Sequence, residues 1–128
     1  MSSKQVLVMR KMPKGQRTGK YCAQAAHASM GALFSIAHID NDKMVIPLDN
    51  EFVKDWVTGL FKKITLSVDN DAELEALYSR AVAAGLPCAI IKDSGLTEYN
   101  GIPTLTAVGI GPADSASIDA ITGNLPLF

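Results

Sequence analysis

The 128-residue sequence has little of the cysteine and histidine chemistry on which many small proteins depend. Its two cysteines, Cys22 and Cys88, form no CxxC pair and have no metal-ligand spacing with His27 or His38. Both cysteines lie among apolar residues, which predicts buried, reduced thiols. The sequence therefore argues against a disulfide scaffold and a zinc site, and it suits a reducing cytoplasm.

Long apolar runs and common catalytic motifs are also missing. The apolar run that ends before Arg10 is too short for the core of a signal peptide. The stretch Tyr21–Ala37 is interrupted by polar and small residues, which argues against a membrane span. None of the motifs GxxxxGK[ST], GxGxxG and GxSxG occurs, so the familiar phosphate-binding loops and the nucleophile elbow are excluded.

What is present suffices for one folded domain spanning residues 1–128, since 48% of the residues are hydrophobic and 20% are charged. The net charge of −1 conceals an uneven distribution. Residues 1–38 carry six basic residues and no acid, whereas the rest carries six basic and thirteen acidic residues. This split indicates a patterned surface rather than a uniformly basic nucleic-acid binder.

Apolar and alternating runs predict four strands, at Gln5–Met9, Lys63–Val68, Cys88–Ile91 and Thr104–Ile110. Helical spacing and composition predict four helices, at Gly19–Ala37, Glu51–Leu60, Asp71–Ala84 and Ser115–Ile121. Helices between strands that are apolar on both faces indicate an α/β fold with a mostly parallel sheet covered on both sides.

Turn-forming and helix-capping residues predict where these elements end. We expect residues 38–50 to be a connection and Gly111-Pro112 to end the last strand. The short link between residues 91 and 104 allows the last two strands to be antiparallel. Helix caps are expected at Thr18, at Asp49 or Asn50 and at Asp69 or Asn70, with a helix stop at Gly85.

In the first predicted helix, Lys20, Gln24 and His27 share one face because they lie at i, i+4 and i+7. Gly31 continues that row and would let another chain segment come close. A basic loop precedes this helix, whose free amides would attract an anion, so a phosphate-adjacent site is predicted. The plainer interpretation is a solvated Lys20, a surface Gln24 and a hydrogen-bonded interior His27.

A second polar cluster begins at Asp93, directly after a buried strand. Loops at the carboxyl ends of strands build the sites of open α/β sheets. A partly buried Asp93 could orient a histidine, hold a lysine or act as a base, and Thr97 and Thr106 could supply hydroxyls. The alternatives are an Asx turn, in which Asp93 binds amides of its own loop, and simple strand packing of Thr106.

Four segments in this order carry a family pattern: QVLVMRK, TGKYCAQAAHA, DSGLTE and GIGPADSASIDAITGNLPL. With GK-x₃-Q-x₂-H-A followed by D-x-G-x-T and GIGP, the sequence resembles the type II peptidyl-tRNA hydrolases over nearly its whole length. The resemblance implies a three-layer α/β/α fold with a four-stranded mixed sheet. It also implies a homodimer that needs no metal and no cofactor.

The activity implied by the resemblance is hydrolysis of the ester between a peptide and the 3′ ribose of tRNA, which recycles tRNA. No membrane partner is expected. The family's functional positions fall on Lys20, Gln24, His27, Asp93 and Thr97, and further on Lys63, Thr106 and Gly111. We expect tRNA contacts from Arg10, Lys11, Lys14, Arg17, Lys63 and Thr106. Asp93, with His27 nearby, would position or deprotonate the water, and Lys20 and Gln24 would stabilise developing negative charge or a terminal phosphate.

The sequence departs from the family pattern in the loop that usually reads DAGRTQ. Leu96 replaces the arginine and Glu98 replaces the glutamine, which changes the local charge by −2. This puts the affinity for tRNA in doubt more than the hydrolysis. Two other functions stay open, a non-catalytic or regulatory binding module on the same fold and a hydrolase of a smaller ester or amide.

Overall fold

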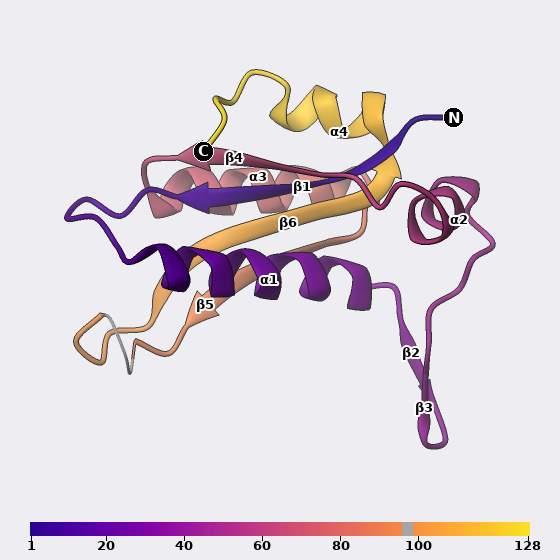
Figure 1. The fold of residues 1–128 in the computed structure, drawn as a ribbon, viewed down its shortest axis with the longest axis horizontal. Helices are drawn as coiled ribbons and strands as arrows, with labels where there is room; N and C mark the ends of the chain where they lie inside the picture. Colours follow the sequence, from indigo (N-terminus) through magenta and orange to yellow (C-terminus); the bar gives the residue numbers. More distant parts are fainter. Residues whose placement is uncertain (96–98) are drawn as a thin grey trace.

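The computed structural model describes residues 1–95 and 99–128, which form two β-sheets and four helices (Figure 1). The main sheet contains β1 (Ser3–Arg10), β4 (Lys63–Val68), β5 (Cys88–Asp93) and β6 (Thr104–Asp114). A small hairpin contains β2 (His38–Asp40) and β3 (Lys43–Val45). The helices are α1 (Thr18–Phe34), α2 (Glu51–Thr58), α3 (Asp71–Ala83) and α4 (Ser115–Thr122).

The main sheet is mixed, in the strand order β4-β1-β6-β5. β1 pairs with β4 in parallel, whereas β6 is antiparallel to both of its neighbours, β1 and β5. The expectation of a mostly parallel sheet is therefore wrong, because the short β5–β6 link turns the last strand back between β5 and β1. The antiparallel pairing of the last two strands is confirmed.

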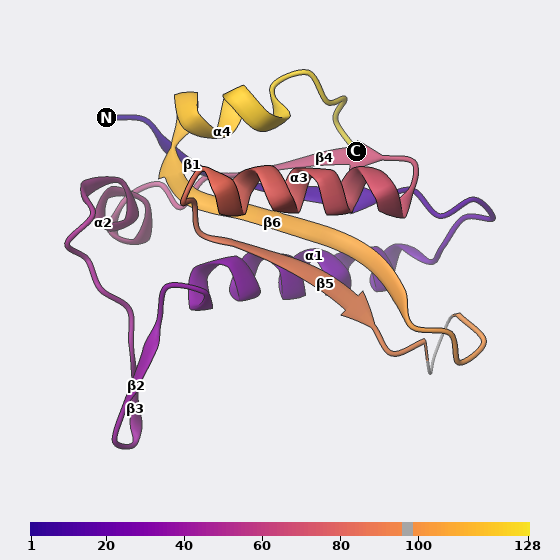
Figure 2. The same cartoon turned by 180° about the vertical axis from the view of Figure 1, so that it is seen from behind.

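Helices cover both faces of this sheet, which confirms the three-layer α/β/α arrangement (Figures 1 and 2). Helices α3 and α4 pack on one face through a core that includes Leu74 and Ile118. Helix α1 packs on the other face through Ala28, against Leu7 and Met9 of β1. Successive residues of β1 thus alternate between two apolar layers, as its continuous apolar sequence requires.

Several predicted boundaries are confirmed and one is wrong. The side chains of Asn50 and Asn70 accept backbone N–H groups at the starts of α2 and α3, and Gly85 adopts a φ of +70° after α3. Thr18 does not cap α1; it is the first residue of the helix, and the N-cap position belongs to Arg17, which makes no side-chain cap bond.

Two other segments differ from the expectation. The predicted connection over residues 38–50 contains the β2–β3 hairpin, which projects from the body of the protein (Figure 1). Strand β6 does not end at Gly111-Pro112 but continues to Asp114. A register shift between Lys4 and Val6 of β1 accommodates the proline, which has no N–H for the ladder.

The cysteines are less buried than their apolar neighbours suggested. Cys22 is exposed on α1, and Cys88 is partly buried at the start of β5. Burial raises the pKa of the Cys88 thiol. Helix α1 is exposed along the side that carries Cys22, so an apolar composition did not imply burial on every side. Among the described residues, no helix is long and apolar enough to cross a membrane.

Helix α1 lies unusually close to the sheet at Gly109 of β6. A Cβ atom at Gly109 would lie 2.2 Å from the carbonyl oxygen of Ala28, nearer than any real contact allows. A Cβ atom at Gly31 would lie 3.1 Å from the Cβ of Ala89, so the expected close approach at Gly31 is confirmed as well. Small residues on both elements therefore set the distance between α1 and the sheet.

We expect Gly109→Ala to lower the free energy of unfolding by about 1–3 kcal/mol, because the added methyl group must push α1 away from the sheet. Urea denaturation measures this loss. The matched control is Gly19→Ala in the first turn of α1, where a Cβ meets nothing within 4 Å. That variant should be as stable as the parent or slightly more so, since alanine favours helix. Equal effects of the two substitutions would contradict the tight contact.

Candidate active site

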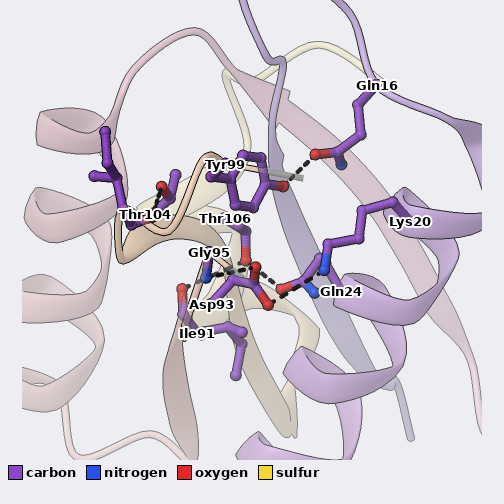
Figure 3. Close-up of polar contacts among 10 residues, drawn as sticks. Gln16, Lys20, Gln24, Ile91, Asp93, Gly95, Tyr99, Thr104 and Thr106 are labelled. Carbon is purple, nitrogen blue, oxygen red and sulfur yellow. Dashed lines mark hydrogen bonds and ion pairs between the residues drawn. The ribbon is translucent and has the colours of Figure 1, made fainter. Parts of the chain in front are cut away.

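The start of α1 meets the carboxyl end of β5 in an ion pair. Nζ of Lys20 lies 3.2 Å from Oδ1 of Asp93, and each side chain is only 15% exposed (Figure 3). The two residues are 73 positions apart in the chain and come from the two clusters that the sequence singled out. The prediction that a partly buried Asp93 holds a lysine is thus confirmed.

The second oxygen of the same carboxylate serves the loop after β5. Oδ2 of Asp93 accepts the backbone N–H of Gly95 at 3.2 Å, which is the Asx-turn arrangement. The two interpretations of Asp93 are therefore both correct, one for each oxygen. Gly95 has a φ of +83°, and a Cβ there would lie 2.3 Å from the carbonyl oxygen of Ile102, so this turn requires glycine.

One helical turn beyond Lys20, Gln24 is held by a hydrogen bond from the sheet. The Thr106 hydroxyl donates to Oε1 of Gln24 at 2.6 Å, and both residues are at most 2% exposed. A β-bulge creates this contact. The register steps from the pair Ile91–Ala107 to the pair Lys92–Leu105, so Thr106 is an extra residue in β6. The bulge re-aims its side chain toward α1.

The hydrogen bond from Thr106 determines how the Gln24 amide is oriented. Since Oε1 accepts from Thr106, the amide nitrogen is directed to the side where Lys20 and Asp93 lie (Figure 3). That nitrogen makes no hydrogen bond to the part of the chain that the structure describes. Gln24 is thus a buried side chain that offers unused N–H donors beside an ion pair, and the interpretation of Gln24 as a surface residue is wrong.

Two residues that the sequence did not single out complete the cluster. The Tyr99 hydroxyl donates a hydrogen bond to Oε1 of Gln16, which connects the loop before β6 to the basic loop before α1 (Figure 3). Nζ of Lys20 lies 5.7 Å from the centre of the Tyr99 ring. A lone aromatic residue in a polar loop was the only signal for Tyr99, and nothing in the sequence distinguished Gln16.

The basic residues expected to contact RNA divide between the two edges of the sheet. Arg10 ends β1 at the same edge as Asp93, and the exposed basic side chains that follow it in the loop before α1 are Lys11, Lys14 and Arg17. Lys63 lies at the opposite edge, because it begins β4 beside Gln5. Its ammonium sits 3.2 Å from the centre of the Phe61 ring, and burial lowers its pKa.

Two other predicted site residues do not join the cluster in the expected way, and a third lies outside the described residues. Thr106 is buried behind Gln24 and is therefore not exposed for a direct RNA contact. His27 is exposed and makes no hydrogen bond within the described part of the chain, so the interior-histidine interpretation is wrong. It lies seven residues from Lys20, about 10 Å along the helix. Thr97, like Leu96 and Glu98, lies outside the described residues.

Gly111 is not part of the cluster. It lies in β6 near the end of the strand, with a φ of +106°, and its carbonyl oxygen accepts a hydrogen bond from the buried side chain of Gln5. Among residues 1–95 and 99–128, no three His, Cys, Asp or Glu side chains form a group that could hold a metal ion. The cluster's donors are therefore an ammonium and an amide, and its acceptor is a carboxylate.

Comparison with known proteins identifies the family of this chain. Residues 3–128 match the family described as Peptidyl-tRNA hydrolase PTH2. The chain is 40% identical to a peptidyl-tRNA hydrolase of Aeropyrum pernix, over 98% of this chain and 95% of that protein. It is 39% identical to one of Methanocaldococcus jannaschii, over 98% of this chain and 99% of that protein. The family indicated by the motifs is confirmed: this chain belongs to the PTH2 family of peptidyl-tRNA hydrolases.

Proposed function

We propose that this protein hydrolyses the ester between a peptide and the 3′ ribose of tRNA, with Asp93, Lys20 and Gln24 carrying the reaction. Family membership and the names of its relatives support the activity. The observation that carries the assignment of residues is the buried Gln24 amide, which offers unused donors beside the Lys20–Asp93 pair. From that position the amide nitrogen could donate to a ligand held beside the ion pair.

The reaction needs a water that loses a proton and a donor for the oxygen that gains charge. The Asp93 carboxylate accepts a proton from the attacking water as the oxygen of that water bonds to the ester carbon. The carbonyl oxygen becomes negative and is stabilised by the Gln24 amide and the Lys20 ammonium. When the C–O bond to ribose breaks, the 3′ oxygen takes the proton back from Asp93, which leaves a free peptide acid and a tRNA hydroxyl.

The Lys20–Asp93 pair also sets the resting state of the site. Lys20 holds one oxygen of Asp93 in place, and the backbone N–H of Gly95 holds the other. Substrate binding only has to shift Lys20 from the carboxylate toward the developing oxyanion, a short movement for a flexible side chain.

The RNA itself would be held by the basic loop. Lys11, Lys14 and Arg17 are exposed between β1 and α1, at the edge of the sheet where the cluster lies. Phosphates of a tRNA acceptor end could bind there with the ester directed to Asp93. The roles of His27, Thr97 and Lys63 in the site stay predictions from the resemblance. A homodimer and a cytoplasmic location likewise stay predictions from the resemblance and from a substrate of translation.

We expect Lys20→Ala and Asp93→Ala each to lower kcat for peptide release from N-acetyl-aminoacyl-tRNA by about 100-fold or more, because each removes a charge that the transition state uses. Acid-precipitable counts from labelled substrate measure release. Exposed Lys43→Ala in the hairpin is the matched control and should keep full activity.

The same assay separates the other two functions. Binding of tRNA by the unmodified protein without release would indicate a binding module. Turnover of small esters that is indifferent to tRNA would indicate a different hydrolase. If both Lys20→Ala and Asp93→Ala released peptide at the parent rate, the assignment of these residues would be wrong.

Thr106 acts in this scheme only through Gln24, so we expect Thr106→Val to lower kcat about tenfold with little change in KM. The valine leaves Oε1 of Gln24 without its donor and frees the amide to rotate, and it lowers stability by about 1–3 kcal/mol. Thr106→Ser keeps the hydroxyl and should restore most of kcat. A serine variant as slow as the valine variant would mean that packing, not the hydrogen bond, is what matters.

The role of the basic loop predicts a salt dependence. We expect binding of deacylated tRNA to weaken steeply with salt, and Lys14→Gln and Arg17→Gln each to reduce the slope of log K against log[salt] by about 0.7–0.9. Fluorescence titration at several salt concentrations gives the slope. Lys43→Gln, which makes the same charge change in the hairpin, should leave it unaltered. An unchanged slope in the loop variants would place the RNA elsewhere.

A further inference from the structure

A pocket lies behind the catalytic cluster, on the opposite face of the sheet. It has a volume of about 510 Å³ and opens at the carboxyl edge of β1 and β5. Its charged lining comes from β1, β5 and the first turns of α3, namely Arg10, Lys92, Asp71 and Glu75. The segment that leads into β6 closes it with Tyr99 and Pro103.

This pocket and the catalytic cluster are neighbours. Lys92 and Asp93 are successive residues of β5, so they point to opposite faces, Lys92 into the pocket and Asp93 toward Lys20. Tyr99 belongs to both, because it lines the pocket and its ring lies 5.7 Å from the Lys20 ammonium. A ligand that extends around the end of β5 would therefore occupy both faces.

The polar groups of the pocket are not satisfied by one another. Within residues 1–95 and 99–128, Arg10, Lys92, Asp71 and Glu75 take part in no ion pair. The Arg10 guanidinium donates one hydrogen bond to the carbonyl oxygen of Leu105 at 3.3 Å, but its Nε is buried and has no partner there. Such a donor is rare in native proteins.

The mixture of charges selects the kind of ligand. Two carboxylates disfavour a simple anion, and two cations disfavour a simple cation. A nucleobase fits both, since its planar faces suit the Tyr99 ring and Pro103, and its edge combines donors with acceptors. Cytosine matches best, because its amino group can donate to a carboxylate while its ring nitrogen and carbonyl oxygen accept from Arg10 or Lys92.

We propose that this pocket binds a cytosine of the single-stranded CCA end of tRNA, next to the terminal adenosine that carries the ester. The proposal rests on the proposed function, because it assigns a place to a neighbouring nucleotide of the same substrate. Uracil presents a carbonyl oxygen where cytosine has its amino group, so Asp71 and Glu75 repel it. The pocket thus distinguishes the acceptor end of tRNA from other RNA ends.

The experiment uses N-acetyl-aminoacyl-tRNA, acylated chemically, with the normal end or with one of the two cytosines replaced by uracil. For the unmodified protein, we expect one of these replacements to raise KM about tenfold with little change in kcat. The double variant Asp71→Ala/Glu75→Ala should bring the uracil-to-cytosine ratio of KM close to one. Asp42→Ala, an acid removed from the hairpin, should keep the ratio of the parent.

The ratio is insensitive to a general gain in RNA affinity from removing acids, because that gain applies to both substrates. Equal KM values for all three ends in the unmodified protein would overturn the cytosine pocket and leave the hydrolase assignment intact. So would a preference for cytosine that persists unchanged in the double variant. Failure to release peptide from any of the three substrates would instead overturn the proposed function.

Discussion

The close seat of α1 on the sheet is the constraint on which the rest of the site depends. Ala28 and Ala32 of the helix are fully buried, and Gly109 of β6 leaves no room for even a methyl group beneath Ala28. Because the helix lies this near, polar side chains of its first two turns reach the strands directly. Lys20 then meets the end of β5, and Gln24 meets β6, without any intervening layer of apolar side chains.

Close packing also removes water from the Lys20–Asp93 pair. A lysine and a carboxylate that are each 15% exposed lose much of their hydration, so their attraction has to offset the cost of burial. The Asx turn at Gly95 supplies Asp93 with a further donor. The result is a charge pair that forms without substrate and still keeps part of each side chain exposed to solvent.

The sequence predicted the parts of this site that follow from local periodicity. Spacing alone put Lys20 and Gln24 on one helix face, and the end of an apolar strand pointed to Asp93. It failed where the outcome depended on pairing between distant segments. The bulge that turns Thr106 toward Gln24 exists only once β6 pairs with β5, and the same pairing carries β6 through Gly111-Pro112. His27 follows the helix face but is exposed, so periodicity overestimated its contact.

The sequence is basic over residues 1–38 and acidic beyond them, and both kinds of charge occur at the carboxyl edge of the sheet. The exposed cations of the loop after β1 lie at the same edge as Asp71 and Glu75, which begin α3 on the other face of the sheet. Phosphates would be drawn to the loop and repelled from the start of α3, which only a base edge with an exposed amino group could approach. On the proposed function, the acidic residues would limit where an RNA end can lie. A net charge of −1 is then compatible with a tRNA substrate, because attraction and exclusion would act on neighbouring faces.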